Sequence, residues 1–256
     1  MRRTAARRGA RCGLRTRIVD GIAWLTLDRA DAGNRITAAL AQELCSTVAD
    51  LDADDDVIAV VLAASGTSFC LGVEDGGEWE HQLDWVEAIA RLTRPVVAAI
   101  QGDAIAEGLE VALACDLRIA SNRARLALSQ LQAGRLPSHG GTQRLPRTVG
   151  RMCALDLLLT GRMVAAAEAQ RIGLVSRVVP HGSLARALRQ LVHDLKGKGP
   201  IALRFAKEAV LKGSDLTLDQ GIRLEEDLYV LLQTTQDRSE GIDAFVHKRR
   251  PVYRGR

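Results

Sequence analysis

Two uninterrupted apolar runs constrain the fold of this chain most strongly. They are VIAVVLAAS at residues 57–65 and PVVAAIQG at residues 95–102, and both are rich in valine, isoleucine and alanine. A strand with one face in water alternates apolar and polar side chains, whereas a strand covered on both faces has no need to. The two runs therefore predict buried strands in a sheet that other elements cover on both sides.

Segments with helical periodicity separate these strands. Residues 34–54 repeat apolar side chains at helical spacing, and Thr37 is suited to cap the start of that helix. A second helix is expected at residues 83–92, before Pro95. Further strands are expected at 22–29, 117–122 and 175–180, and further helices at 108–116, 154–162, 165–173 and over most of the chain beyond Leu184. Strands that alternate with helices predict an α/β fold with right-handed crossovers.

The length of 256 residues suits one large domain, or one domain with a small appendage. We expect a disordered basic arm at residues 1–15, an α/β core at residues 16–195 and a helical region at residues 196–256 that packs on the body or on a neighbouring subunit. The arm is expected because the first 17 residues hold seven arginines and no acid. Such a segment is typical of a solvated arm or an over-long translation start, and a mitochondrial presequence has the same composition.

Composition narrows the range of partners. No run approaches the roughly 18 apolar residues that a membrane-spanning helix needs, so no membrane association is expected. The five cysteines are scattered without a CxxC pair, which argues against disulfides and a metal site and favours a reducing compartment. We therefore expect the cytoplasm, or the mitochondrial matrix if the arm is a presequence. Aromatic residues make up only 3%, so the basic ends suit a phosphate-bearing small ligand and no nucleic-acid partner is expected.

The segment QGDAIAEGLEVALACDLRIAS at residues 101–121 carries two carboxylates, Glu107 and Glu110, in apolar surroundings. Removing a carboxylate from water is costly unless another group pairs with it or uses it. Gly108 lets the chain turn from a strand into a helix, whose first N–H groups lack partners and carry partial positive charge. SFCLGVED at residues 68–75 offers a second glycine turn. Two such N–H groups on one carbonyl oxygen would form an oxyanion hole.

The order of the motifs resembles a known family. SFCLGVED, QGDAIAEGLEVALACDLRIAS and AGRLPSHGGTQRLPRTVGR are followed by LTGRMVAAAEAQRIGLVSRVV and SEGIDAFVHKRR. From about Thr16 to Arg250 the chain resembles the enoyl-CoA hydratase/isomerase (crotonase) family. The resemblance implies a crotonase-like ββα spiral core that binds acyl-CoA, a C-terminal helical trimerisation region, and a homotrimer or homohexamer. Coenzyme A would enter as part of the thioester substrate, and no permanently bound cofactor is implied.

The resemblance also implies site residues. The backbone N–H groups of Val73 and Glu107 would hold the thioester oxygen, and Glu110 matches the first of two catalytic glutamates. The second glutamate of the family is replaced by Gln130, and Ala106 and Glu107 replace glycines of the family's three-glycine turn. The residues implied in binding substrate or coenzyme A are Leu71, Gly72, Glu74, Gly108, Ser129, Gly134, Phe245 and Lys248. The last two would approach the adenine and phosphates, often from an adjacent subunit.

The missing second acid bears on the reaction. Adding water to a double bond requires a base for the water and an acid for the α-carbon, and a glutamine amide can orient water but not exchange its proton. We expect hydration or double-bond isomerisation of an enoyl-CoA through a thioester enolate, with Glu110 acting alone or with help from His139. The alternatives are decarboxylation, C–C cleavage, thioester hydrolysis, or a silent acyl-CoA-binding subunit. The Glu107 side chain is expected to be solvated, with a substitute acid as the alternative, and residues 74–95 are expected to form a short lid.

Overall fold

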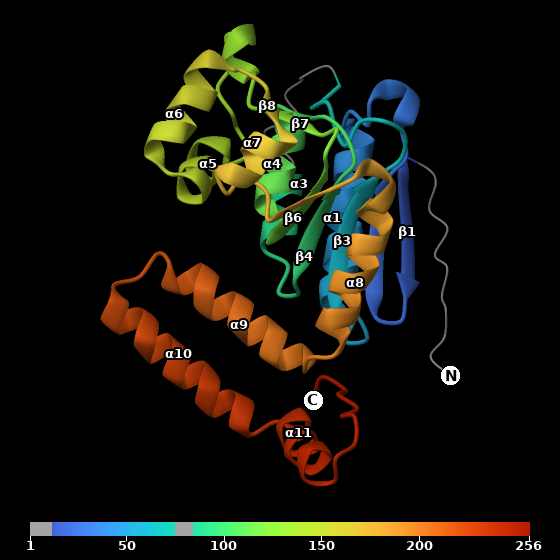
Figure 1. Cartoon of the computed structure of the whole chain (residues 1–256), viewed down its shortest axis with the longest axis vertical. Helices are drawn as coiled ribbons and strands as arrows, with labels where there is room; N and C mark the ends of the chain where they lie inside the picture. Colours follow the sequence, from blue (N-terminus) through green and yellow to red (C-terminus); the bar gives the residue numbers. More distant parts are fainter. Residues whose placement is uncertain (1–11, 75–83) are drawn as a thin grey trace.

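The computed structural model describes residues 12–74 and 84–256, and its centre is a six-stranded sheet with the order β1-β2-β3-β4-β6-β9 (Figure 1). The strands are β1 (Leu14–Val19), β2 (Ile22–Leu27), β3 (Ala59–Ala64), β4 (Val96–Ile100), β6 (Leu117–Ser121) and β9 (Arg177–Val179). Only the β1–β2 pair is antiparallel, and the other neighbours in this sheet run parallel. The α/β class predicted from the sequence is confirmed.

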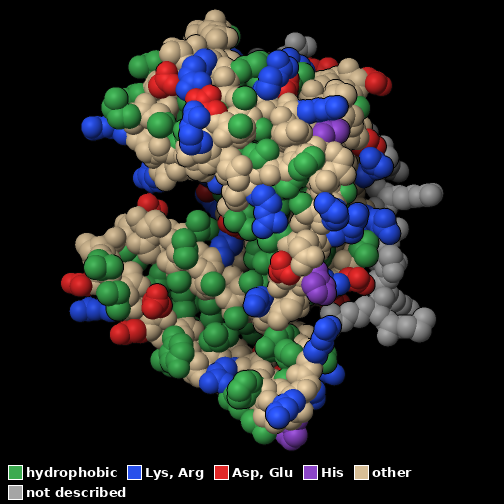
Figure 2. All heavy atoms as spheres, in the orientation of Figure 1, with side chains coloured by type: hydrophobic (Ala, Val, Ile, Leu, Met, Phe, Trp, Pro, Cys, Tyr) green, Lys and Arg blue, Asp and Glu red, His purple; other side chains and the backbone are tan. Residues whose placement is uncertain are grey.

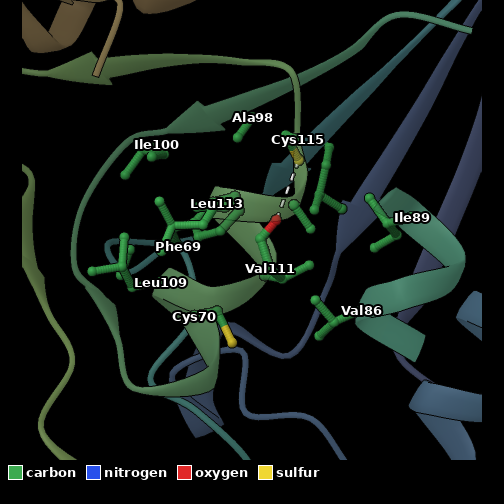
Figure 3. Packing of buried hydrophobic residues seen from close by; sticks show 14 of the residues in the cluster. Phe69, Cys70, Val86, Ile89, Ala98, Ile100, Leu109, Val111, Leu113 and Cys115 are labelled. Atoms are coloured by element: carbon green, nitrogen blue, oxygen red, sulfur yellow. Dashed lines mark hydrogen bonds between the residues drawn. The ribbon is translucent and has the colours of Figure 1, made fainter. Parts of the chain in front are cut away.

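Helices cover both faces of this sheet. The helices α1 (Ala38–Ala53), α3 (Trp85–Ala90) and α4 (Glu107–Ala114) pack on one face, and α8 (Leu184–Lys196) packs on the other. Successive residues of β3 point to opposite sides, so that Val60 joins the first core and Val61 the second. Figure 3 shows the first core, where α3 and α4 meet below β4 and the Cys115 thiol donates to the Val111 carbonyl at 3.4 Å. The prediction of strands buried on both sides is therefore confirmed.

Several element boundaries differ from expectation. β1, which begins at Leu14, was not predicted as a strand, and its first two residues were assigned to the basic arm although they pair with β2. Residues 1–11 of that arm lie outside the described part. Thr37 caps α1 as predicted, because its Oγ1 accepts a hydrogen bond from the Leu40 N–H at 3.2 Å. A second, three-stranded sheet was not predicted; it consists of β5 (Ala104–Ile105), β7 (Arg125–Ala127) and β8 (Val164–Ala165).

The remaining elements are mainly helical. They are η1 (Ala30–Ala32), η2 (Gln130–Ala133), α5 (Gly141–Val149), α6 (Arg151–Thr160), α7 (Ala166–Arg171), η3 (His181–Ser183), α9 (Pro200–Gly213), α10 (Leu218–Gln233) and α11 (Gln236–Val246). α9 and α10 form a helical hairpin that extends away from the sheet. Lys207 ties this hairpin to the core through the Asp116 carboxylate at 2.8 Å. Across the described ranges, no helix has both the length and the apolar character needed to span a membrane.

Candidate active site

The start of α4 is positioned by a close approach of two backbones. A Cβ atom at Gly108 would lie 2.0 Å from the Cys70 carbonyl oxygen, so only glycine lets the helix pack against that segment. Ala106 turns the chain into the helix with φ 53° and ψ −122°, a backbone conformation that residues with a side chain rarely adopt. Glu107 is the first residue of the helix, so its backbone is helical. The unusual backbone therefore falls on Ala106, and Glu107 is accommodated without strain.

Glu110 lies fully buried on α4 and is held from two sides. Its Oε1 accepts hydrogen bonds from the backbone N–H groups of His139 and Gly141, both at 2.8 Å. Its Oε2 accepts from Gln130 Nε2 at 2.9 Å. Two N–H donors occupy the lone-pair directions of Oε1, and Oε2 lies on the Gln130 side. Gly141 leaves room for the carboxylate, since a Cβ atom there would lie 2.9 Å from Oε1.

The side chain of Glu107 is buried, with an exposed fraction of 1%, so the expectation of a solvated side chain was wrong. Its Oε2 accepts a hydrogen bond from the Val73 N–H at 3.1 Å. Its Oε1 lies 3.4 Å from Arg135 Nη2 and 3.5 Å from Gln130 Nε2. These donors replace the hydrogen bonds to water that the Glu107 carboxylate loses on burial. The side chain can therefore be buried although a solvated position was expected. Gly72 leaves the space, because a Cβ atom there would lie 2.6 Å from Oε2.

Gln130 connects the two carboxylates, Glu107 and Glu110, which we call the carboxylate pair. It begins η2, is 2% exposed, and donates from Nε2 toward both members of the pair. Its Oε1 is buried without a hydrogen-bond partner within residues 12–74 and 84–256. A buried amide oxygen without a partner is uncommon and marks a position where a ligand or water donor can bind.

The proposed oxyanion donors lie together. The segment that carries Val73 is fixed by a bridge to Ile36, since the Ile36 N–H donates to the Gly72 carbonyl and the Glu74 N–H to the Ile36 carbonyl. Val73 in turn touches the first residue of α4 through the Glu107 carboxylate. The structure thus brings Val73, Glu107, Glu110 and Gln130 into one cluster, and their catalytic roles stay predictions.

Other expected residues fall around this cluster or away from it. Leu71 precedes the Gly72 turn, the Glu74 side chain pairs with Arg29 at 2.5 Å, and half-buried Ser129 precedes Gln130. Gly134 adopts a left-handed conformation at the end of η2. Phe245, 85% exposed on α11, and Lys248 do not join the site within one chain, because α11 lies far from α4 in Figure 1.

His139 contributes to the cluster mainly through its backbone. Its N–H holds Glu110, whereas its ring stands edge-on to the buried Trp85 ring with 5.3 Å between the centroids. An auxiliary acid–base role for the His139 ring therefore stays a prediction. Trp85 belongs to the region expected as a lid, and residues 75–83 of that region lie outside the described part.

Three further observations concern groups around the cluster. Burial raises the pKa of the Cys70 thiol to about 12, so it is neutral near pH 7 and unsuited to act as a nucleophile. Among the described residues no group of three or more His, Cys, Asp or Glu side chains could hold a metal ion.

A cavity of about 1200 Å³ lies between α8 and the sheet, and the carboxylate pair is not among its lining residues.

Sequence reasoning missed two residues of the site. Arg135 was overlooked because nothing in its local pattern distinguishes it from a solvated loop arginine. Gly141 stands in the GGTQRLPRTVG block that carries the family resemblance, and its adjacent glycines were the available signal. Both act on carboxylates more than 25 residues away in the chain.

Comparisons with known proteins show the family and the fold of this chain. A family model described as enoyl-CoA hydratase/isomerase matches residues 17–256. A Bacillus subtilis (strain 168) protein, provisionally named an enoyl-CoA hydratase/isomerase, is 38% identical over 91% of this chain and 95% of its own length. The 2,3-dehydroadipyl-CoA hydratase of Escherichia coli (strain K12) is 34% identical over 91% of this chain and 94% of its own length. The crystal structure of an enoyl-CoA hydratase from Bacillus anthracis superimposes with a TM-score of 0.92 and 33% identity, over 95% of this chain and 100% of that chain.

Proposed function

Because this chain belongs to the enoyl-CoA hydratase/isomerase family, we propose that it is a lyase or isomerase acting on an enoyl-CoA thioester. The observation that carries this proposal is the orientation of Glu110. Three donors hold its buried carboxylate beside Gln130 and close to the Val73 turn. A carboxylate fixed in this way can move protons at a carbon next to a thioester, provided that the thioester oxygen is stabilised as it gains charge.

The stabilisation would come from two backbone donors. The N–H groups of Val73 and Glu107 would hold the thioester oxygen, which becomes negative when an enolate forms. One donor of this kind typically contributes about 10²–10³-fold to the rate. In double-bond isomerisation, Glu110 would take a proton from one carbon, the electrons would pass through the enolate, and Glu110 would return the proton to a second carbon.

Substrate binding is proposed to extend beyond this cluster. Four of the expected binding residues lie at the two turns, and two flank η2. They are proposed to contact the acyl and pantetheine parts: Leu71, Gly72, Glu74 and Gly108 at the turns, and Ser129 and Gly134 at the ends of η2. Phe245 and Lys248 are proposed to contact the adenine and phosphates of coenzyme A in an adjacent protomer, since α11, which carries Phe245 and ends two residues before Lys248, lies far from α4 in its own chain. A lysine supplies a point charge for a phosphate. No permanently bound cofactor is part of the proposal.

A panel of acyl-CoA thioesters analysed by mass spectrometry tests the reaction. Gain of water indicates hydration, unchanged mass with a shifted double bond indicates isomerisation, and loss of carbon dioxide or release of free acid would contradict the proposal. Glu110→Gln is expected to lower kcat at least about 100-fold and leave coenzyme A binding nearly unchanged, because only the proton-transfer group is lost.

The matched control makes the same chemical change on exposed Glu225 of α10. Glu225→Gln is expected to retain full turnover. Equal turnover in Glu110→Gln and the unchanged chain would remove Glu110 from the mechanism.

A further inference from the structure

The side chain of Glu107 occupies the acceptor position of the proposed oxyanion hole. The Val73 N–H, which would hold the thioester oxygen, donates instead to Glu107 Oε2 at 3.1 Å. The second proposed donor is the backbone N–H of Glu107 itself. One N–H directed at the Glu107 carboxylate cannot at the same time hold a thioester oxygen with good geometry. Productive binding of a thioester therefore requires the carboxylate to leave Val73.

The contacts of Glu107 indicate where its carboxylate can go. Its other oxygen, Oε1, already lies 3.4 Å from Arg135 Nη2 and 3.5 Å from Gln130 Nε2. A side-chain rotation that breaks the bond to Val73 can keep both of these partners. Charge favours this movement, because a carboxylate beside a developing enolate oxygen is repelled, whereas the Arg135 guanidinium attracts it.

The displaced carboxylate would lie across Gln130 from Glu110. Gln130 Nε2 is 2.9 Å from Glu110 Oε2, so the same amide group would contact both members of the carboxylate pair. Two carboxyl groups on one small site can divide the roles of acid and base, which a carboxylate and an amide cannot. The orphaned Oε1 of Gln130 is available to accept a hydrogen bond from a water molecule between them.

On the basis of the proposed function, we propose that Glu107 is a second catalytic carboxylate, which closes the oxyanion hole until a thioester displaces it. In hydration, the pair starts with one proton. The ionised member takes a proton from water while the water oxygen bonds to the β-carbon and the π-electrons move to the thioester oxygen. The protonated member then gives its proton to the α-carbon. The pair again holds one proton, and the thioester carbonyl is restored.

Three variants test the two roles of Glu107. Glu107→Gly removes the carboxylate, keeps the backbone donor and opens the hole. It is expected to bind the unreactive butyryl-CoA at least about 5-fold more tightly and to hydrate crotonyl-CoA at least about 100-fold more slowly. Glu107→Gln keeps a side-chain oxygen near Val73 without a carboxylate, so it is expected to lose hydration without the gain in affinity. In the double variant, Gln130→Glu added to Glu107→Gly returns a carboxylate opposite Glu110 and is expected to raise hydration at least about 10-fold.

Binding and turnover separate failure of this proposal from failure of the proposed function. If Glu107→Gly binds butyryl-CoA no more tightly than the unchanged chain, closure of the hole is overturned. If Glu107→Gly hydrates crotonyl-CoA at the unchanged rate, or if the unchanged chain binds butyryl-CoA but hydrates no enoyl-CoA, the acid–base role is overturned. In all three of these cases the assignment to acyl-CoA chemistry stands. Absence of acyl-CoA binding in all variants and in the unchanged chain would overturn the proposed function itself.

Discussion

At the scale of single residues, Ala106 carries the backbone cost of the site. Its φ of 53° with ψ of −122° belongs to a region in which glycine is normal and an alanine is strained. Such strain is typically of the order of 1–3 kcal/mol, and it persists only where the surrounding structure enforces it. Here β5 and α4 enforce the strained conformation, because β5 ends at the residue before Ala106 and α4 begins at the residue after it.

Relief of this strain should stabilise the protein. Ala106→Gly is expected to increase the free energy of unfolding by about 1 kcal/mol, because the released strain exceeds the entropy that glycine adds to the unfolded chain. Urea denaturation measures the change. Ala112→Gly, in the middle of α4, is the control and is expected to lose at least about 1 kcal/mol. A less stable Ala106→Gly would show that residue 106 is not strained.

The sequence predicted which residues form the cluster better than it predicted the surroundings of each. Glu110 and Gln130 were identified from their motif, and the cluster contains both. The burial of Glu107 was missed because it depends on partners contributed by two other segments: the Val73 N–H and the side chain of Arg135. No local pattern encodes that convergence, since the compensating donors become neighbours only in the folded chain.

At the scale of elements, the site depends on how closely α4 approaches the segment at Cys70. A methyl group at Gly108 would meet the Cys70 oxygen at 2.0 Å and the Cys70 carbonyl carbon at 2.7 Å. Backbone atoms cannot move aside as a flexible side chain can. α4 would have to shift, and with it the Glu107 amide and both carboxylates.

Gly108→Ala is therefore expected to lower the free energy of unfolding by at least about 2 kcal/mol and to reduce acyl-CoA turnover sharply. Thermal unfolding and the crotonyl-CoA assay measure the two effects. Gly182→Ala is the matched control, because a Cβ atom there meets nothing within 4 Å, and it should change stability by less than about 0.5 kcal/mol. Equal behaviour of the two variants would contradict the close approach.

Strands were predicted correctly where the apolar run in the sequence is long, and most of the strands that were missed are short. β3 and β4 come from long apolar runs, and both were found where expected. β5 and β8 have two residues each and β7 has three, which is too short for any periodicity to register. β1 was partly assigned to the arm because arginines at alternate positions conceal its strand character, although Leu14 is buried and each residue pairs with β2.

At the scale of the whole molecule, the C-terminal helices expose more apolar surface than a solitary chain needs. Figure 2 shows hydrophobic side chains gathered over α9 and α10, beside the hollow that separates them from the upper part. The exposed apolar residues of these two helices include Val210, Leu211, Leu218, Ile222, Tyr229, Val230 and Leu231. Apolar patches of this extent mark protein interfaces. We therefore propose that copies of the chain associate through this region, and the family resemblance implies a homotrimer or a homohexamer.

Sedimentation equilibrium tests this inference. The unchanged protein is expected at about three or six times the 27.7 kDa of one chain. Val230→Glu, at a position 62% exposed, is expected to dissociate the assembly because it places a charge in an apolar interface. Glu226→Gln, a change at an exposed polar position of α10, should leave the assembly intact. A species of one chain mass for the unchanged protein would contradict association.

The fixed carboxylate of Glu110 has a stereochemical consequence. Its Oε1 is bound by two backbone N–H groups, so in the proposed mechanism Glu110 would exchange its proton at Oε2, on the side of Gln130. A planar enolate offers two faces, but a carboxyl group that cannot turn addresses one of them. The fixed orientation of Glu110 would then determine the configuration of the product. In every turnover the proton would be added to the same face of the substrate.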